Sequence, residues 1–232
     1  MTPFDILYTP LDIPEPPAVD LNLLVDWVRK YQDEQEILNR KDSSKVLKEK
    51  YPWDIIYCKV EYHWYQDFDK LFPTLAEYCD TAFGVPRERI SNIVILHTKD
   101  NFVGEGFWHT DTDETGLRFY LDNQEKGEFL HMRPTVLPYT NRASAVDAIQ
   151  QDVETALQKK HFSAKLLKPN QGFFINNVRS IHSAYTSTPG LVRISFSVTV
   201  DTDMIDMPKS LSNLIVQSAE KYKEHALFWC SH

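Results

Sequence analysis

The sequence predicts a mainly β fold with flanking helices, and three observations lead to this prediction. The chain has 232 residues, of which 42% are hydrophobic and 12% aromatic, enough to build the core of one domain. All seven glycines lie between Gly84 and Gly190. Within that half, short runs of strand-forming residues alternate with turns, a pattern typical of a sandwich or barrel. We therefore predict a single domain over residues 1–232.

Residues 1–85 are predicted to form an N-terminal arm followed by helices. Prolines at positions 10, 14, 16 and 17 make residues 1–19 an extended arm, because proline resists helix formation. Asp20 is a candidate N-cap for a helix whose apolar residues recur at helical spacing. That apolar stripe comprises Leu23, Leu24, Trp27, Val28 and Tyr31. Residues 53–65 are rich in strand-forming residues.

A second helix is predicted over residues 67–83, ending at Gly84. Its apolar stripe comprises Leu71, Leu75, Tyr78 and Cys79. The tail, residues 209–229, predicts a C-terminal amphipathic helix. Its stripe is expected to pack on the core and comprises Leu211, Leu214, Ile215, Ala219 and Tyr222.

The β core is predicted over about residues 90–202. Its strands are expected at 91–97, 106–111, 117–122, 128–133, 164–168, 172–177, 181–186 and 191–200. Residues 143–160 have a helical composition and predict an insertion into this core.

Charge and cysteine content narrow the class of protein. The net charge is −8 and no run of Lys or Arg occurs, so neither nucleic acid nor an anionic membrane is an expected partner. The three cysteines are odd in number and lack C-x-x-C spacing, which argues against a disulfide framework or a zinc site. The N-terminus has acids and prolines where a signal peptide needs an apolar run. We expect a cytoplasmic protein, monomeric or homodimeric.

The segment at residues 107–111 contains a candidate metal site. In a strand, residues two apart point to the same side, so His109 and Asp111 converge. An imidazole and a carboxylate suit a divalent first-row metal. A lone H-x-D is also common by chance, the alternative being a loop histidine beside a solvated aspartate. Asp113 is a second candidate for the carboxylate, although residues 113–116 read as a turn.

A third ligand is predicted at His182. The segment Thr188-Pro189-Gly190-Leu191 suits a type II turn. If Pro189-Gly190 is a two-residue hairpin loop, His182 pairs with Ser197 and shares a face with Arg193 and Ser195. His131 is the main rival as third ligand, but no R-x-S follows it in the sequence.

The strand at 191–200 carries two distinct rows of side chains. The apolar row is Val192, Ile194, Phe196, Val198 and Val200; the polar row is Arg193, Ser195, Ser197 and Thr199. A polar row either meets water or lines a cavity. An arginine beside a serine and close to a ligand histidine can bind a carboxylate through two parallel hydrogen bonds.

The order H-x-D, distal His and R-x-S resembles the Fe(II)/2-oxoglutarate-dependent dioxygenases over about residues 90–202. The resemblance implies a double-stranded β-helix, a jelly-roll core like that of cupins. It implies Fe(II) held by His109, Asp111 and His182, which are then the catalytic residues. It also implies that Arg193 binds 2-oxoglutarate with help from Ser195. The implied reaction uses O2 to hydroxylate or otherwise oxidise a small-molecule, amino-acid or peptide substrate, releasing succinate and CO2.

The resemblance extends to a possible branch of the superfamily. His109-Thr110-Asp111, the strand Leu117-Arg118-Phe119-Tyr120 and Asn176-Asn177 look similar to aspartyl/asparaginyl β-hydroxylases, some of which lack the carboxylate ligand. Gly127-Glu128 could equally indicate prolyl hydroxylase-like members.

Arg118 and Tyr120 alternate with apolar neighbours and are expected to point into the barrel. Arg118 then binds either an acidic substrate or the near carboxylate of 2-oxoglutarate, unless it forms a structural ion pair. Two other function classes share the fold: a non-catalytic cupin-like module that binds a metal or small ligand, and a metal-free interaction domain.

Overall fold

The computed structural model describes residues 1–39, 53–84, 87–98, 104–105, 115–120, 127–134, 162–176, 180–186, 189–190, 192–200 and 207–229. Its helices are α1 (Leu21–Asn39), α3 (Tyr65–Leu71), α4 (Pro73–Ala82) and α6 (Lys209–Lys221). Its strands in the first half are β1 (Ile6–Pro10), β2 (Trp53–Lys59), β3 (Ile90–Thr98), β4 (Gly104–Glu105), β5 (Thr115–Tyr120) and β6 (Gly127–Pro134). Those in the second half are β7 (Phe162–Leu166), β8 (Gly172–Ile175), β9 (Ser180–Thr186), β10 (Val192–Val200) and β11 (Leu227–Phe228).

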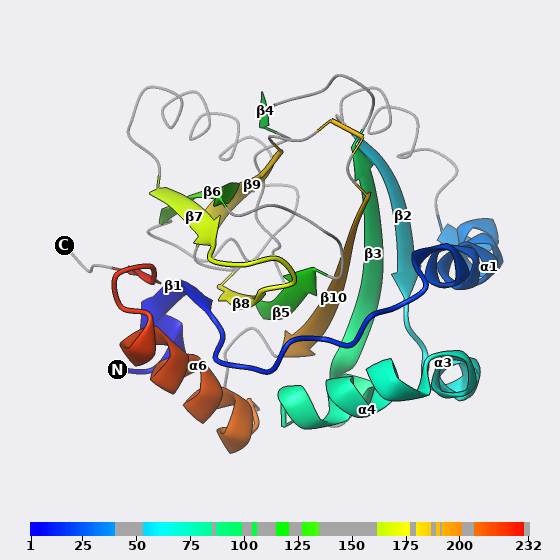
Figure 1. Ribbon diagram of the computed structural model, residues 1–232, viewed down its shortest axis with the longest axis horizontal. Coiled ribbons are helices and arrows are strands. Elements are labelled where there is room, and N and C mark those ends of the chain that lie inside the picture. The colour runs from blue at the N-terminus through cyan, green and yellow to red at the C-terminus, as the bar shows by residue number, and fades with distance from the viewer. Residues whose placement is uncertain are drawn as a thin grey trace.

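The strands form two antiparallel sheets that face each other (Figure 1). The seven-stranded sheet has the order β11-β1-β8-β5-β10-β3-β2, and the four-stranded sheet has the order β4-β9-β6-β7. A hydrogen bond of 2.8 Å from the Tyr8 hydroxyl on β1 to the carbonyl oxygen of Lys165 on β7 joins one sheet to the other. The described part of the chain therefore combines antiparallel sheets with helices.

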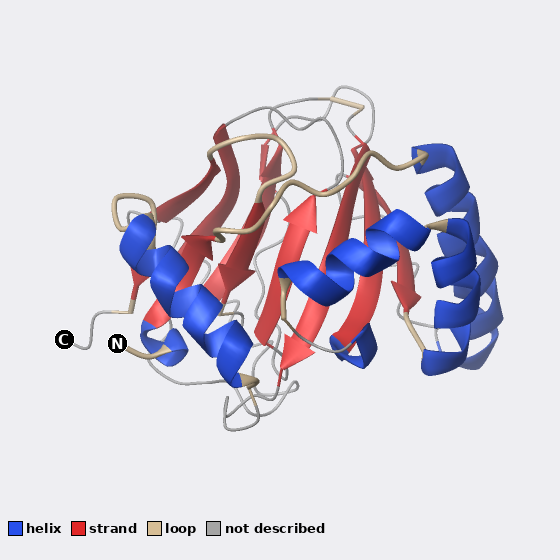
Figure 2. Cartoon of the chain, turned by 60° about the horizontal axis from the view of Figure 1, so that its bottom comes forward, coloured by secondary structure: helices blue, strands red, loops and turns tan. Residues whose placement is uncertain are grey.

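The helices cover the outer face of the seven-stranded sheet, and Figure 2 shows α4 and α6 lying across its strands. The alternate residues Ile194, Phe196 and Val198 of β10 belong to one buried cluster with Leu75 of α4 and Ile215 of α6. The ring of Phe196 lies 6.1 Å from that of Phe68 on α3, measured between centroids. Burial of these apolar side chains is the main force that holds the helices on the sheet.

A second, smaller cluster fills one end of the space between the sheets. It contains Tyr8, Phe173 and Ile175 from the large sheet and Ala164 and Leu166 from the small sheet, all buried. The inner faces of β1, β8 and β7 therefore form a packed apolar floor.

The predicted strands that fall on described residues are confirmed, with ends that differ by two residues or fewer. They correspond to β3, β5, β6, β7, β8, β9 and β10. The strand predicted at 106–111 and the helix predicted at 143–160 lie outside the described residues. The cap at Asp20 is also confirmed, because its side-chain oxygen accepts hydrogen bonds from the backbone N–H groups of Asn22 and Leu23.

Three predictions of local structure need correction. The arm at 1–19 is extended, but Ile6–Pro10 form β1 inside the large sheet, between β8 and β11. The helix expected at 67–83 is interrupted at Phe72, because a residue before proline is driven out of the helical region. The tail helix ends at Lys221, and Leu227–Phe228 return as β11 beside β1.

Two further observations concern cysteines and membrane spans. Cys58 and Cys79 are buried free thiols. Among the described residues, no helix combines the length and apolar character needed to cross a membrane.

The packing between β10 and α3 makes a testable prediction. Phe196→Ala should lower the free energy of unfolding by about 3–5 kcal/mol, because it removes a buried ring that contacts Phe68. Leu71→Ala is the control, since Leu71 is 43% exposed and should change stability by about 0.5 kcal/mol or less. Urea denaturation followed by circular dichroism measures both. Equal effects of the two substitutions would contradict this packing.

Candidate functional site

The polar row of β10 lies on the inner face of the large sheet. Arg193, Ser195 and Ser197 alternate with the residues that pack against the helices, and all three are buried. Because successive residues of a strand point to opposite faces, the polar row faces the small sheet. The two rows predicted from the sequence are confirmed for positions 193–198.

Arg193 spans the space between the sheets. Its side chain is only 1% exposed, and its Nη1 donates a hydrogen bond of 3.3 Å to the carbonyl oxygen of Tyr185 on β9. A guanidinium stays charged in proteins, and burying a charge is costly unless hydrogen-bonding groups or an opposite charge surround it. The site is therefore a place inside the protein where a fixed positive charge is held.

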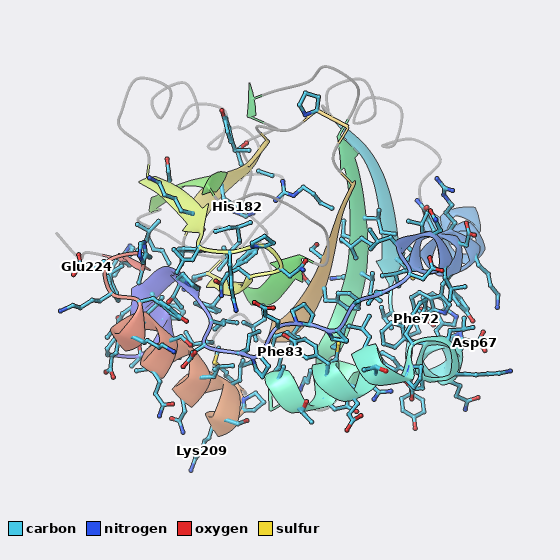
Figure 3. All side chains as sticks on the ribbon, viewed as in Figure 1. Asp67, Phe72, Phe83, His182, Lys209 and Glu224 are labelled. Atoms are coloured by element: carbon cyan, nitrogen blue, oxygen red, sulfur yellow. The ribbon has the colours of Figure 1, made fainter. Side chains whose placement is uncertain are left out.

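His182 faces the same space from the small sheet. On β9 and β6, Ala184 pairs with Leu130, which pairs with Ala164 of the interior cluster. His182 shares the face of Ala184, two residues on, and is 2% exposed. Figure 3 shows His182 between the two sheets.

The imidazole of His182 has a defined neighbour on one side. Its Nδ1 lies 3.3 Å from the carbonyl oxygen of Ser180. A carbonyl can only accept, so this contact favours the tautomer with the proton on Nδ1. In that tautomer the lone pair is on Nε2, the arrangement found in many metal-binding histidines, whose second nitrogen donates to a backbone carbonyl.

The hairpin register predicted for β9 and β10 is wrong. The two strands are not paired: β9 pairs with β4 and β6, and β10 pairs with β3 and β5. The turn at Pro189-Gly190, where Gly190 has φ 70°, leads from one sheet to the other. His182, Arg193 and Ser195 thus do not share one face of one sheet. His182 lies on the inner face of the small sheet, and Arg193 and Ser195 lie on the inner face of the large sheet. Because these two faces oppose each other, all three residues border the space between the sheets.

Register places Arg118 and Tyr120 on the inner face of the large sheet. Position 118 is paired with Ser197 on one side and Phe173 on the other, and position 120 is paired with Ser195. Leu117, which precedes Arg118 on the strand, belongs to the cluster that faces the helices. The expectation that these two positions face inward agrees with the backbone, while their side chains lie outside the described part.

His109 and Asp111, like Asp113, lie outside the described residues. Within the part of the chain that is described, no group of three or more His, Cys, Asp or Glu side chains could hold a metal ion. His131 pairs with Ser183, so its position is on the face of the small sheet opposite to that of His182. The rival third ligand is therefore on the wrong side for a site shared with Arg193.

Other candidate groups are structural. Asn176 is buried, its side-chain amide lies 3.5 Å from the carbonyl oxygen of Phe4, and its backbone carbonyl accepts a hydrogen bond from the Ser180 hydroxyl.

Burial raises the pKa of the Cys79 thiol to about 12, so this thiol stays protonated near neutral pH and is a poor nucleophile.

Comparison with known proteins does not identify a family. The chain matches no family model and no curated protein sequence.

Two features of the site were not predicted from the sequence. The carbonyl of Tyr185 orients Arg193, and Asn92 stands beside Ser197 on the inner face. A backbone carbonyl leaves no signal in a sequence. Asn92 left only a weak signal, because it directly precedes the continuous apolar run at residues 93–96.

The opposite facing of neighbouring residues on β10 can be tested by stability. Ile194→Ser should cost about 2–4 kcal/mol, because it places a hydroxyl in the helix-facing core. Ser195→Ala should change stability by about 1 kcal/mol or less, the net value of one hydrogen bond. Denaturant midpoints measure both. A larger loss for Ser195→Ala than for Ile194→Ser would contradict the assigned faces.

Proposed function

We propose that this protein is an Fe(II)- and 2-oxoglutarate-dependent oxygenase built on a jelly-roll core. It hydroxylates, or otherwise oxidises, a small molecule, an amino acid or a peptide side chain. The observation that carries the proposal is Arg193, a buried guanidinium that reaches across the space bordered by His182.

The strand order supports the core. In the series β3 to β10, the first strand pairs with the last, β5 pairs with β8, and β6 pairs with β7. The pairing of β4 with β9 completes this set, in which each pair of strands encloses the next pair in chain order. This is the pattern of one long two-stranded ribbon wound around itself, as in jelly rolls. The strands β1, β2 and β11 then extend one sheet at its two edges.

Arg193 fits the far carboxylate of 2-oxoglutarate. The bond from Nη1 to the Tyr185 carbonyl fixes the orientation of the planar guanidinium. A planar guanidinium matches a carboxylate through two parallel hydrogen bonds, which a buried site strengthens by excluding water. Ser195 is two residues along the same face and supplies a hydroxyl group. Tyr120, whose position pairs with Ser195, is proposed as a further residue of this pocket.

His182 fits one position of an iron site made with His109 and Asp111. Its Nδ1 contact to Ser180 favours a lone pair on Nε2. In the pairing of β4 with β9, Gly104 stands opposite Thr186 and Glu105 opposite Tyr185, so β4 itself runs toward the His182 end of β9. His109 follows four residues later, so the chain is long enough to reach that end. Two His and one carboxylate are the ligand set of non-haem iron oxygenases.

Within this proposal each residue has a separate task. Bound Fe(II) would supply the centre at which the keto acid and O2 react. His182 would hold one coordination position from the small sheet, and Arg193 with Ser195 would hold the carboxylate from the large sheet. Because the two sheets supply the two tasks, the distance between the sheets sets where the co-substrate lies relative to the metal.

Binding of the metal and of 2-oxoglutarate should be separable by substitution. Under anaerobic conditions, Fe(II) plus 2-oxoglutarate should raise the thermal midpoint and give a weak visible charge-transfer band. His182→Ala should abolish both effects. Arg193→Met should keep metal binding but weaken 2-oxoglutarate at least about 30-fold, since removing one partner of a buried charge pair costs 2 kcal/mol or more.

Ser183→Ala is the matched control for these substitutions, because Ser183 is the neighbour of His182 on the opposite face of β9. It should retain the band and the thermal shift. Loss of metal binding in Arg193→Met, or no response of the wild-type protein to the two ligands together, would refute the assignment.

Turnover distinguishes an oxygenase from a cupin-like binding module. The wild-type protein with Fe(II), ascorbate, 2-oxoglutarate and O2 should release succinate slowly without added substrate, and His182→Ala should release none. Succinate is measured by mass spectrometry. A protein that binds both ligands but releases no succinate in any condition is a binding module.

A further inference from the structure

A second polar group lies on the inner face of the large sheet, away from Arg193. Asn92 on β3 pairs with Ser197 on β10, and Ser197 pairs with Arg118 on β5. These three positions stand side by side across three neighbouring strands, and we call them the inner polar row.

The inner polar row faces the small sheet. Its neighbours Ile93, Phe196 and Leu117 all belong to the helix-facing cluster, so the row itself is on the other side. On β8 the partner of Arg118 is Phe173, which belongs to the cluster between the sheets. The polar row therefore borders the apolar floor of the same interior space.

The row is too far from Arg193 to belong to the same carboxylate site. Ser197 is the fourth residue after Arg193 on β10, which is ~13 Å along an extended strand. That spacing of backbone positions is longer than the separation of the two carboxylates of a five-carbon diacid. The row is therefore a separate place to bind a ligand.

Water reaches the row along β3. Ile93 and Ile95 are buried at 1% exposure under the helices, whereas Asn92 and Val94, on the inner face, are partly exposed. The inner faces of β8 and β1 are closed, since Phe173 and Tyr8 are fully buried. Solvent thus reaches the inner face of the large sheet at β3, beside the inner polar row.

We propose that the inner polar row is the subsite that binds a carboxylate of the substrate. This inference rests on the proposed oxygenase function and assigns its substrate class: a carboxylic acid of the amino-acid or peptide type. Arg118 would contribute the positive charge, while the Asn92 amide and the Ser197 hydroxyl contribute neutral donors. The polar row holds the acid end, and the apolar floor at Phe173 and Tyr8 accepts an apolar part of the molecule.

The test uses matched acids and amides as probes. The full-length protein with Fe(II) and 2-oxoglutarate is offered the twenty N-acetyl-L-amino acids and their C-terminal amides, and stimulated release of succinate is measured. At least one acid should stimulate succinate release, and its amide should stimulate it at least about tenfold less, the loss expected for one charge-assisted bond. Amides that stimulate succinate release as well as the acids do would overturn the proposal.

Substitutions then test whether the inner polar row binds the substrate or the co-substrate. Arg118→Gln and Asn92→Asp should raise KM for the active acid at least about tenfold, with a much smaller change in the dissociation constant of 2-oxoglutarate. Arg118→Lys should recover part of the loss. Ser183→Ala, on the other sheet face, should leave KM unchanged. If the dissociation constant of 2-oxoglutarate rises as much as KM, the row belongs to the co-substrate and the inference is wrong.

Direct binding separates failure of this inference from failure of the proposed function. Calorimetric titration of the metal-free protein with the acid and amide probes requires no turnover. Wild-type protein that releases no succinate but binds an acid in preference to its amide, with loss in Arg118→Gln, would refute the oxygenase and retain the carboxylate subsite. Equal binding of acid and amide in that titration would refute the subsite.

Discussion

The alternation of side chains along β10 is the constraint on which both the core and the candidate site depend. This strand lies between β3 and β5 in the middle of the large sheet. Ile194, Phe196 and Val198 hold the helices on one face, which forces Arg193, Ser195 and Ser197 into the space between the sheets. A shift of one residue would turn the guanidinium toward the helices and the apolar row toward the small sheet. The stability of the core thus keeps the charge of Arg193 in the interior.

The sequence predicted most of the strands because their pattern is local. Alternating rows such as those of β10 read directly as a two-sided strand, and the polar row already indicated an inner face. Asp20 was equally readable as a cap, since its side chain bonds to residues two and three positions away. The break at Phe72 was also local, but the apolar stripe of residues 67–83 masked the signal of Pro73. Of the candidate site, His182, Arg193 and Ser195 are buried, but they lie on two sheets and not on the single face that the assumed hairpin predicted.

What the sequence did not predict is which strands pair. A Pro-Gly turn looks the same whether the chain returns along its own sheet or crosses to another, so β9 and β10 were wrongly paired. The N-terminal arm posed a similar problem. Residues 6–9 lie between Pro3 and Pro10 and look like a loop, yet Tyr8, Thr9 and Pro10 pair with β8, more than 160 residues away. Long-range pairing of this kind depends on tertiary contacts that no short window contains.

The central place of β10 has a consequence for how the protein folds. Its two neighbours, β3 and β5, are separated from it by some seventy residues or more, and they do not pair with each other. During synthesis both strands therefore leave the ribosome with an unsatisfied edge, which persists until residues 192–200 arrive to fill the gap. Contacts of such long range slow folding, and unpaired edges favour aggregation. We expect the nascent chain to depend on chaperones until β10 is synthesised. In the folded sheet, β10 is hydrogen-bonded on both sides and its edges are no longer available for pairing.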